Sequence, residues 1–135
     1  MNFYNTHEAA QFLAKELKNN PRGVILLEGE MGAGKTTLIT EVLRILDPKI
    51  KVSSPTFAII NQYTDSIFHA DLYRIKCESE LENIGFWEIV AGDNLIFVEW
   101  GSKLGQKLAK MGCLSVKIGG SGAQKRHVCI EKRGG

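Results

Sequence analysis

The feature that most constrains this chain is a glycine-rich segment that lies between an apolar run and an amphipathic run. The segment GEMGAGKTT follows VILLE, and the amphipathic run KTTLITEVLRIL begins at its lysine. A short apolar run of this kind is typical of a strand buried on both faces of a parallel sheet. The later run places leucine, isoleucine and valine at helical spacing, which predicts a helix with one apolar face. Strand, glycine loop and helix in this order predict an α/β fold.

Within the segment, four residues match the phosphate-binding pattern GxxxxGK[ST]: Gly29, Gly34, Lys35 and Thr36. Glycines let the backbone curl until its N–H groups point at phosphate oxygens, and the following helix adds the positive end of its dipole. Lys35 would bring charge to the β- and γ-phosphates, and the Thr36 hydroxyl would bind Mg²⁺. The alternative is a glycine-rich turn that holds no ligand. We expect a nucleoside triphosphate held by the loop residues Glu30, Met31, Gly32, Ala33, Gly34, Lys35, Thr36 and Thr37.

The rest of the chain predicts further helices and strands without a repeat or a linker. PTFAIINQY and SIFHADLY predict an antiparallel hairpin, LIFVEW a second buried strand, KLGQKLAKM a short helix, and LSVKI and HVCIEK a closing pair of strands. The prediction is one domain over residues 1–135. Its fold class is a P-loop NTPase-like, three-layer α/β domain whose central, mostly parallel sheet carries antiparallel additions.

Two further helices are predicted from their boundaries and apolar spacing. Asn5 predicts the N-cap of a helix that ends before Pro21. The stretch ESELENIGFWEIV predicts a helix with Leu81, Ile84 and Ile89 facing inward, although its central glycine weakens it.

Composition limits the environment in which this chain is expected to work. The chain has no apolar stretch near the roughly 20 residues of a membrane span and no basic-then-apolar leader, so we expect a cytoplasmic protein. Its three cysteines are widely separated and predict neither a disulfide framework nor a zinc site. A net charge of +2 is too small to indicate nucleic-acid binding, although the tail QKRHVCIEKRGG is locally basic. Any RNA contact would therefore be local or shared with a partner.

Two acidic residues at the ends of predicted strands are candidates for hydrolysis. Glu99 ends LIFVE, and the carboxyl ends of parallel strands lie at the same sheet edge as a phosphate-binding loop, so its carboxylate can reach a bound metal. Asp71 ends IFHAD and could orient a water molecule or hold a metal-bound one. The alternatives are a surface carboxylate at position 99 and an ion pair between Asp71 and Arg74.

Two other segments have both a functional and an ordinary interpretation. SSPTF places Ser54 and Thr56 beside Pro55, where a hydroxyl could sense a γ-phosphate as in switch loops, or the residues could simply form a turn. Trp100 directly follows the candidate metal ligand and is either part of the core or a lid on the nucleotide.

The order of these segments is more specific than any one of them. GEMGAGKTT, SSPTF, HADLYR, ELENIGFWEI and VEW follow one another in a way that closely resembles the bacterial TsaE (YjeE) family, over residues of about 5 to about 130. The resemblance implies a cytoplasmic ATPase that works with the TsaB and TsaD proteins. Members of the family support formation of threonylcarbamoyladenosine at adenosine 37 of tRNA, and TsaD is thought to perform the transfer. Any contact with tRNA would then be indirect, through the complex.

The resemblance also assigns roles to residues of this sequence. It places Lys35 and Thr36 at the phosphates and Mg²⁺ of ATP, Glu99 at the second metal-site position and Asp71 at the acid needed for hydrolysis. Thr6 and Arg126 resemble positions that could frame the adenine. One position departs from the family, because the chain has EWG where the family usually has EWP. Glycine frees a backbone that proline would fix, which affects how firmly Trp100 is placed.

Two other classes of P-loop protein remain as alternatives. A small-molecule kinase would need an acceptor pocket and extra cations over the phosphates, and the chain has five arginines and no evident lid insertion. A GTP-driven or non-hydrolysing switch normally carries DxxG and NKxD, and neither pattern occurs here. An ATPase is therefore the predicted activity, and it is expected to be slow without partners.

Overall fold

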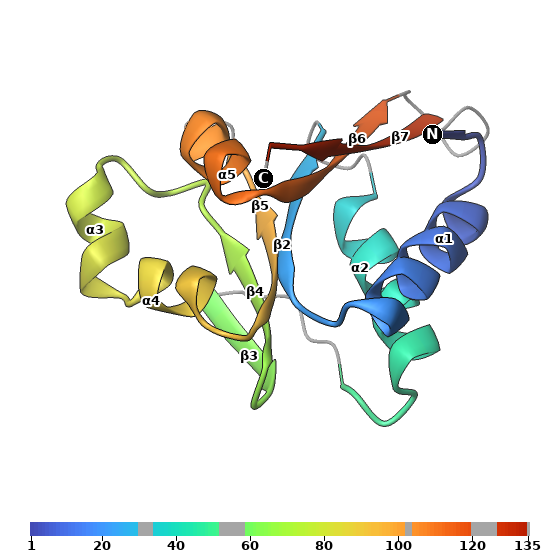
Figure 1. Cartoon of the computed structure of the whole chain (residues 1–135), viewed down its shortest axis with the longest axis horizontal. Helices are drawn as coiled ribbons and strands as arrows, with labels where there is room; N and C mark the ends of the chain where they lie inside the picture. Colours follow the sequence, from blue (N-terminus) through green and yellow to red (C-terminus); the bar gives the residue numbers. More distant parts are fainter. Residues whose placement is uncertain (30–33, 52–58, 102–103, 120–126, 135) are drawn as a thin grey trace.

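A seven-stranded sheet with the strand order β1-β7-β6-β2-β5-β4-β3 runs through the protein (Figure 1). This computed structural model describes residues 1–29, 34–51, 59–101, 104–119 and 127–134. The strands are β1 (Asn2–Phe3), β2 (Gly23–Glu28), β3 (Ile60–Thr64), β4 (Ile67–Asp71), β5 (Leu95–Glu99), β6 (Cys113–Gly119) and β7 (His127–Arg133). The helices are α1 (Thr6–Asn19), α2 (Lys35–Leu46), α3 (Glu78–Asn83), α4 (Phe86–Ala91) and α5 (Gly105–Met111).

The centre of the sheet is parallel and its edges are antiparallel. Strand β2 pairs in parallel with β5 and β6, and β4 pairs in parallel with β5. Strands β1 and β7 at one edge, and β3 at the other, are antiparallel to their neighbours. This confirms the predicted fold class and both predicted antiparallel strand pairs. The two-residue strand β1 was not predicted.

Helices cover both faces of the sheet, because successive side chains of the buried strands point to opposite sides. Ile25 and Leu27 of β2 pack with α1 and α2, whereas Val24 and Leu26 pack with α3, α4 and α5. Figure 1 shows the first pair of helices on the right of the sheet and the other three on the left. Helix α1 begins as predicted, with Asn5 Oδ1 accepting the N–H groups of the next turn.

The segment predicted as one helix after residue 77 is two short helices. Gly85 separates α3 from α4 and has a φ of +76°, a left-handed conformation that strains any residue with a side chain. The break changes which residues face inward. Leu81 is buried as predicted, but Ile84 is 38% exposed, and the fully buried aromatic side chain of this segment is Phe86.

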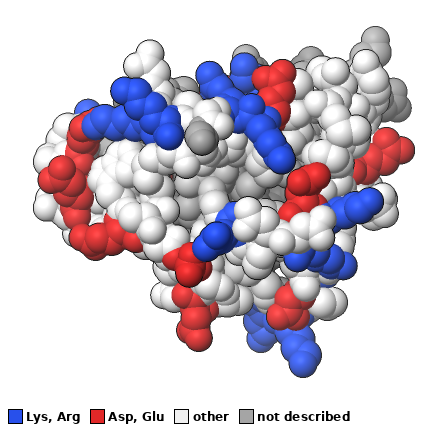
Figure 2. Space-filling model, in the orientation of Figure 1, with Lys and Arg blue, Asp and Glu red and all other residues white. Residues whose placement is uncertain are grey.

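The surface carries both signs of charge. Figure 2 shows lysines and arginines interspersed with aspartates and glutamates on the face it presents, in keeping with the net charge of +2. Within the described ranges, no helix is both long and apolar enough to cross a membrane.

Candidate functional site

The candidate site lies at the carboxyl edge of the parallel strands, where β2 leads through the glycine segment into α2. Gly34 caps the helix with a φ of +100°, which favours glycine at this position. Lys35 is the first helical residue, and it is only 6% exposed. The residues from Glu30 to Ala33 lie outside the described part of the chain, so their predicted phosphate contacts stay predictions.

Lys35 is held by groups of the site itself. Its Nζ donates a hydrogen bond to the Gly29 carbonyl oxygen at 2.7 Å, and it lies 3.7 Å from the centroid of the Trp100 ring. Burial lowers the pKa of Lys35, and the charges of Glu99 and Asp71 oppose that shift. The lysine therefore shares its surroundings with both carboxylates that the sequence singled out.

Those two carboxylates come from neighbouring strands at the same level of the sheet. Asp71 ends β4 and pairs in register with Glu99, which ends β5. Asp71 Oδ1 accepts the backbone N–H of Tyr73 at 3.1 Å. Among the ion pairs of the described residues, none joins Asp71 to Arg74, so the alternative interpretation of Asp71 lacks support.

A hydrogen-bond chain leads away from Glu99 through the buried His69 to the half-buried Tyr63. Glu99 Oε2 lies 2.5 Å from Nε2 of His69, which has no exposed surface. On the other side of the imidazole, Nδ1 lies 3.0 Å from the hydroxyl of Tyr63. Sequence reasoning missed this chain. The available signal was a lone histidine within the otherwise apolar run IFHA of a buried strand.

Trp100 is only half-buried and does not belong to the core, so the core interpretation of this residue is not supported. Its φ of 60° is the one positive value among the described non-glycine residues. The edge of its ring meets Tyr73 at a centroid distance of 5.0 Å, and its face covers the Lys35 ammonium. The strained backbone thus turns the indole over the head of α2.

The hydroxyl groups predicted to surround the nucleotide are only partly described. Thr36 and Thr37 are exposed residues of the first turn of α2. Thr6 begins α1. The start of α1 lies beside α2, because Nδ1 of His7 is 3.8 Å from Oε2 of Glu41.

Thr56 and Arg126 lie outside the described residues, as do Ser54 and Pro55. The adenine contacts therefore stay predictions.

The available ligands fit Mg²⁺. A threonine hydroxyl and a carboxylate are hard oxygen donors, and Mg²⁺ sites commonly combine one or two carboxylates with substrate phosphates and water. In the part of the chain that the structure describes, no three His, Cys, Asp or Glu side chains gather into a metal site of their own. A cation here would thus depend on Thr36, Glu99 and the nucleotide.

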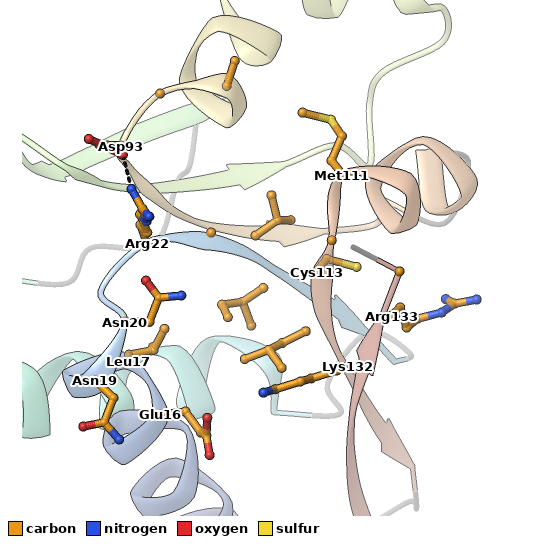
Figure 3. A pocket seen from close by; sticks show the side chains of 18 residues that line it. Glu16, Leu17, Asn19, Asn20, Arg22, Asp93, Met111, Cys113, Lys132 and Arg133 are labelled. Atoms are coloured by element: carbon orange, nitrogen blue, oxygen red, sulfur yellow. Dashed lines mark hydrogen bonds and ion pairs between the residues drawn. The ribbon is translucent and has the colours of Figure 1, made fainter.

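A pocket of about 550 Å³ lies at the opposite edge of the sheet, around the amino end of β2 (Figure 3). The ion pair between Arg22 and Asp93 crosses one side of it, and Glu16, Cys113 and Lys132 also line it. It contains none of the predicted site residues. Phosphate-binding loops follow the carboxyl ends of parallel strands, so this pocket is not the candidate nucleotide site.

Comparison with known proteins agrees with this geometry. The model of the family "Threonylcarbamoyl adenosine biosynthesis protein TsaE" matches residues 2–128. The chain belongs to the TsaE family. The tRNA threonylcarbamoyladenosine biosynthesis protein TsaE of Rickettsia felis is 39% identical over 99 residues, which cover 70% of this chain and 56% of that protein. Its counterpart in Bacillus subtilis is 35% identical over 111 residues, covering 80% of this chain and 68% of that protein.

The fold of a solved relative is also similar. The crystal structure of YdiB from Bacillus subtilis superposes with a TM-score of 0.64 at 25% identity, covering 100% of this chain and 84% of that one. The aligned part of the chain spans little more than half of the length of the Rickettsia relative.

Gly101, where the resemblance led us to expect proline, is closely packed. Gly101 directly follows Trp100 and is buried. A Cβ placed on Gly101 would lie 2.8 Å from both Leu26 Cδ1 and Val98 Cγ1. Gly101 therefore does more than free the backbone, because its missing side chain lets the chain at this point approach β2 and β5.

We expect Gly101→Ala to lower the free energy of unfolding by about 1–2 kcal/mol, because overpacking a filled core typically costs about 1–3 kcal/mol. Chemical denaturation monitored by circular dichroism would measure the change. Gly119→Ala is the matched control, since a Cβ at Gly119 meets nothing within 4 Å, and it should stay within about 0.5 kcal/mol of the original chain. Equal stability of the two variants would contradict the packing argument.

Proposed function

We propose that this chain is the ATP-binding and ATP-hydrolysing component of the machinery that forms threonylcarbamoyladenosine at position 37 of tRNA. It would act on a complex of the TsaB and TsaD proteins, in the cytoplasm, as one domain over residues 1–135. The observation that carries the proposal is the placement of Lys35, at the head of a helix, beside Asp71 and Glu99 at the ends of two adjacent strands. Membership of the TsaE family supports both the activity and the pathway.

Each residue of the site has a separate task under this proposal. The ammonium of Lys35 leaves the Gly29 carbonyl and binds the β- and γ-phosphates, while backbone N–H groups at the start of α2 add positive potential. Thr36 and Glu99 would hold Mg²⁺, which when bound neutralises phosphate charge. Asp71 accepts a hydrogen bond from the attacking water and orients it. Trp100 covers Lys35 and limits the access of bulk water.

The site favours hydrolysis over the two rival reactions. A kinase needs a pocket for its acceptor beside the γ-phosphate. The pocket of about 550 Å³ lies at the far edge of the sheet, and the pocket that Trp100 lines holds only about 110 Å³. A switch that does not hydrolyse its nucleotide has no need of Asp71. The carboxylate of Asp71 is level with Glu99 and contributes to the surroundings of Lys35, where it suits the activation of water.

The partners are expected to control the rate. Tyr73 beside Trp100 is 58% exposed, so an aromatic surface is available to another protein next to the site. In switch-type ATPases, residues from a partner often complete the positioning of water. Contact with tRNA would be made through the complex, in keeping with the mixed charge of the chain.

We expect the purified chain to hydrolyse ATP slowly with Mg²⁺, and TsaB, TsaD and tRNA together to stimulate it by tenfold or more. Release of phosphate from ATP and from GTP, each with and without the partners, would measure this. An ATP-specific activity that the partners stimulate supports both the reaction and the role. A phosphorylated small molecule as product would favour a kinase, and binding of both nucleotides without hydrolysis would favour a switch.

A further inference from the structure

The hydrogen-bond chain from the half-buried Tyr63 through the buried His69 to Glu99 has no assigned role in the proposed reaction. Its outer member, Tyr63, lies at an irregularity of the β3–β4 hairpin. Gln62 pairs with Phe68 and Thr64 with Ile67, so Tyr63 is an extra residue in β3. A bulge of this kind re-aims a side chain, and here the Tyr63 hydroxyl lies 3.0 Å from His69 Nδ1.

The direction of the two hydrogen bonds follows from the chemistry of the groups. Burial, and then the charge of Glu99, raise the pKa of the Tyr63 phenol, which therefore keeps its proton. A carboxylate only accepts hydrogen bonds, so the imidazole proton lies on Nε2, and Nδ1 of the neutral ring then accepts from the phenol. The Nε2–H group then donates to Glu99 Oε2, the atom that lies 2.5 Å away.

We infer that Tyr63 and His69 are positioning residues, which fix one oxygen of Glu99 and so aim the other oxygen at the Mg²⁺ of the nucleotide. The inference rests on the proposed function. A carboxylate has two oxygens able to accept or to ligate, and the hydrogen bond from His69 occupies Oε2. Hydrogen-bond partners of a metal ligand commonly set its orientation, and their loss typically costs about 10–100-fold in metal affinity or activity.

Because His69 and Glu99 are both buried, the hydrogen bond between them can hold the Glu99 carboxylate in one orientation. His69 has no exposed surface, and Glu99 is 5% exposed, so bulk water does not compete for their hydrogen bond. The two residues come from neighbouring strands, and His69 precedes Asp71 on the same face of β4. One strand thus supplies both the proposed water-orienting acid and the residue that holds the metal ligand.

The experiment measures the affinity of a fluorescent, non-hydrolysable ATP analogue over a series of Mg²⁺ concentrations. For His69→Gln we expect the Mg²⁺ concentration at half-saturation to rise about 10–100-fold, with little change in affinity for the analogue when Mg²⁺ is absent. Tyr63→Phe removes only the hydroxyl, and we expect a shift of about two- to tenfold in the same direction, as for one neutral hydrogen bond. A ¹⁵N NMR spectrum of the original chain should show the His69 ring with its proton on Nε2.

Tyr4→Phe is the matched control, because Tyr4 also contacts a histidine ring, that of His127, but is 79% exposed. Unchanged Mg²⁺ dependence in folded His69→Gln would overturn the inference, as would an equal loss of affinity with and without Mg²⁺, since that indicates a structural role. If His69→Gln does not fold, Tyr63→Phe decides the question by the same two criteria. Absence of Mg²⁺-dependent binding in the original chain would instead refute the proposed function.

Discussion

Replacing Lys35 with alanine is expected to lower the affinity for ATP by about 100-fold or more. Hydrogen bonds to charged groups are each worth about 1.5–3 kcal/mol, and the Lys35 ammonium would make such bonds to two phosphates. The lysine is already placed for the task, since it is buried at the first position of α2 with Asp71 and Glu99 nearby. Titration with a fluorescent ATP analogue in the presence of Mg²⁺ would measure the loss.

Lys107→Ala provides a close control for that experiment. Lys107, like Lys35, lies over an indole, because its Nζ is 5.8 Å from the centroid of Trp87, and it forms an ion pair in which Nζ lies 2.6 Å from Glu78 Oε1. Its side chain is 55% exposed, and it belongs to α5 rather than to the phosphate-binding loop. Affinity should be unchanged in this variant. If Lys35→Ala bound ATP as tightly as Lys107→Ala does, the assignment of the loop would be wrong.

The central fold could be predicted because its signals are local. The apolar run of β2, the periodicity of α2 and the cap of α1 each lie within one element, and the structure confirms all three. The seven-stranded order depends instead on pairing between distant segments. Strand β1 has only two residues, Asn2 and Phe3, which is too short for any period to show.

The errors in the prediction have physical causes at single residues. Gly85 was treated as a weak point within one helix, but its left-handed conformation ends α3 and starts α4. For Trp100, a position in the core was one of two interpretations, the other being a lid on the nucleotide, and the structure does not support the core position. The positive φ of Trp100, which sequence patterns do not reveal, turns it toward Lys35 instead.

In the candidate site too, residues that belong to one short motif could be predicted, whereas contacts between residues far apart in the sequence could not. Lys35 and Thr36 are recognisable from a pattern of adjacent residues, whereas the bond from His69 to Glu99 joins residues 30 positions apart. Gly101 is another case, because its significance lies in the close approach of Leu26 and Val98. Contacts of this kind depend on the register of β4, β5 and β2, which no single segment encodes.

Asp71→Asn is expected to reduce turnover by about 10²–10⁴-fold, the usual contribution of a positioned acid or base, with affinity for ATP changed only a few-fold. Glu99→Gln is expected to reduce turnover by about 100-fold or more at limiting Mg²⁺, at least as much as the loss of a hydrogen-bond partner of a metal ligand, with affinity for ATP changed only a few-fold when Mg²⁺ is absent. Each substitution removes a charge at almost constant volume. The asparagine oxygen can still accept the Tyr73 N–H, and the glutamine oxygen can still accept from His69. Single-turnover measurements of phosphate release, with TsaB and TsaD present, would separate the chemical step from binding.

The two variants should differ in how they respond to Mg²⁺. Glu99→Gln loses a charged metal ligand, so excess Mg²⁺ should restore part of its turnover, whereas Asp71→Asn should not recover because its defect is in the placement of water. Asp93→Asn is the control, since that carboxylate is 86% exposed and pairs with Arg22 at the opposite edge of the sheet. Normal turnover in Asp71→Asn would leave Asp71 as a turn residue that binds Tyr73. Normal turnover in Glu99→Gln would make the carboxylate a partner of His69 alone.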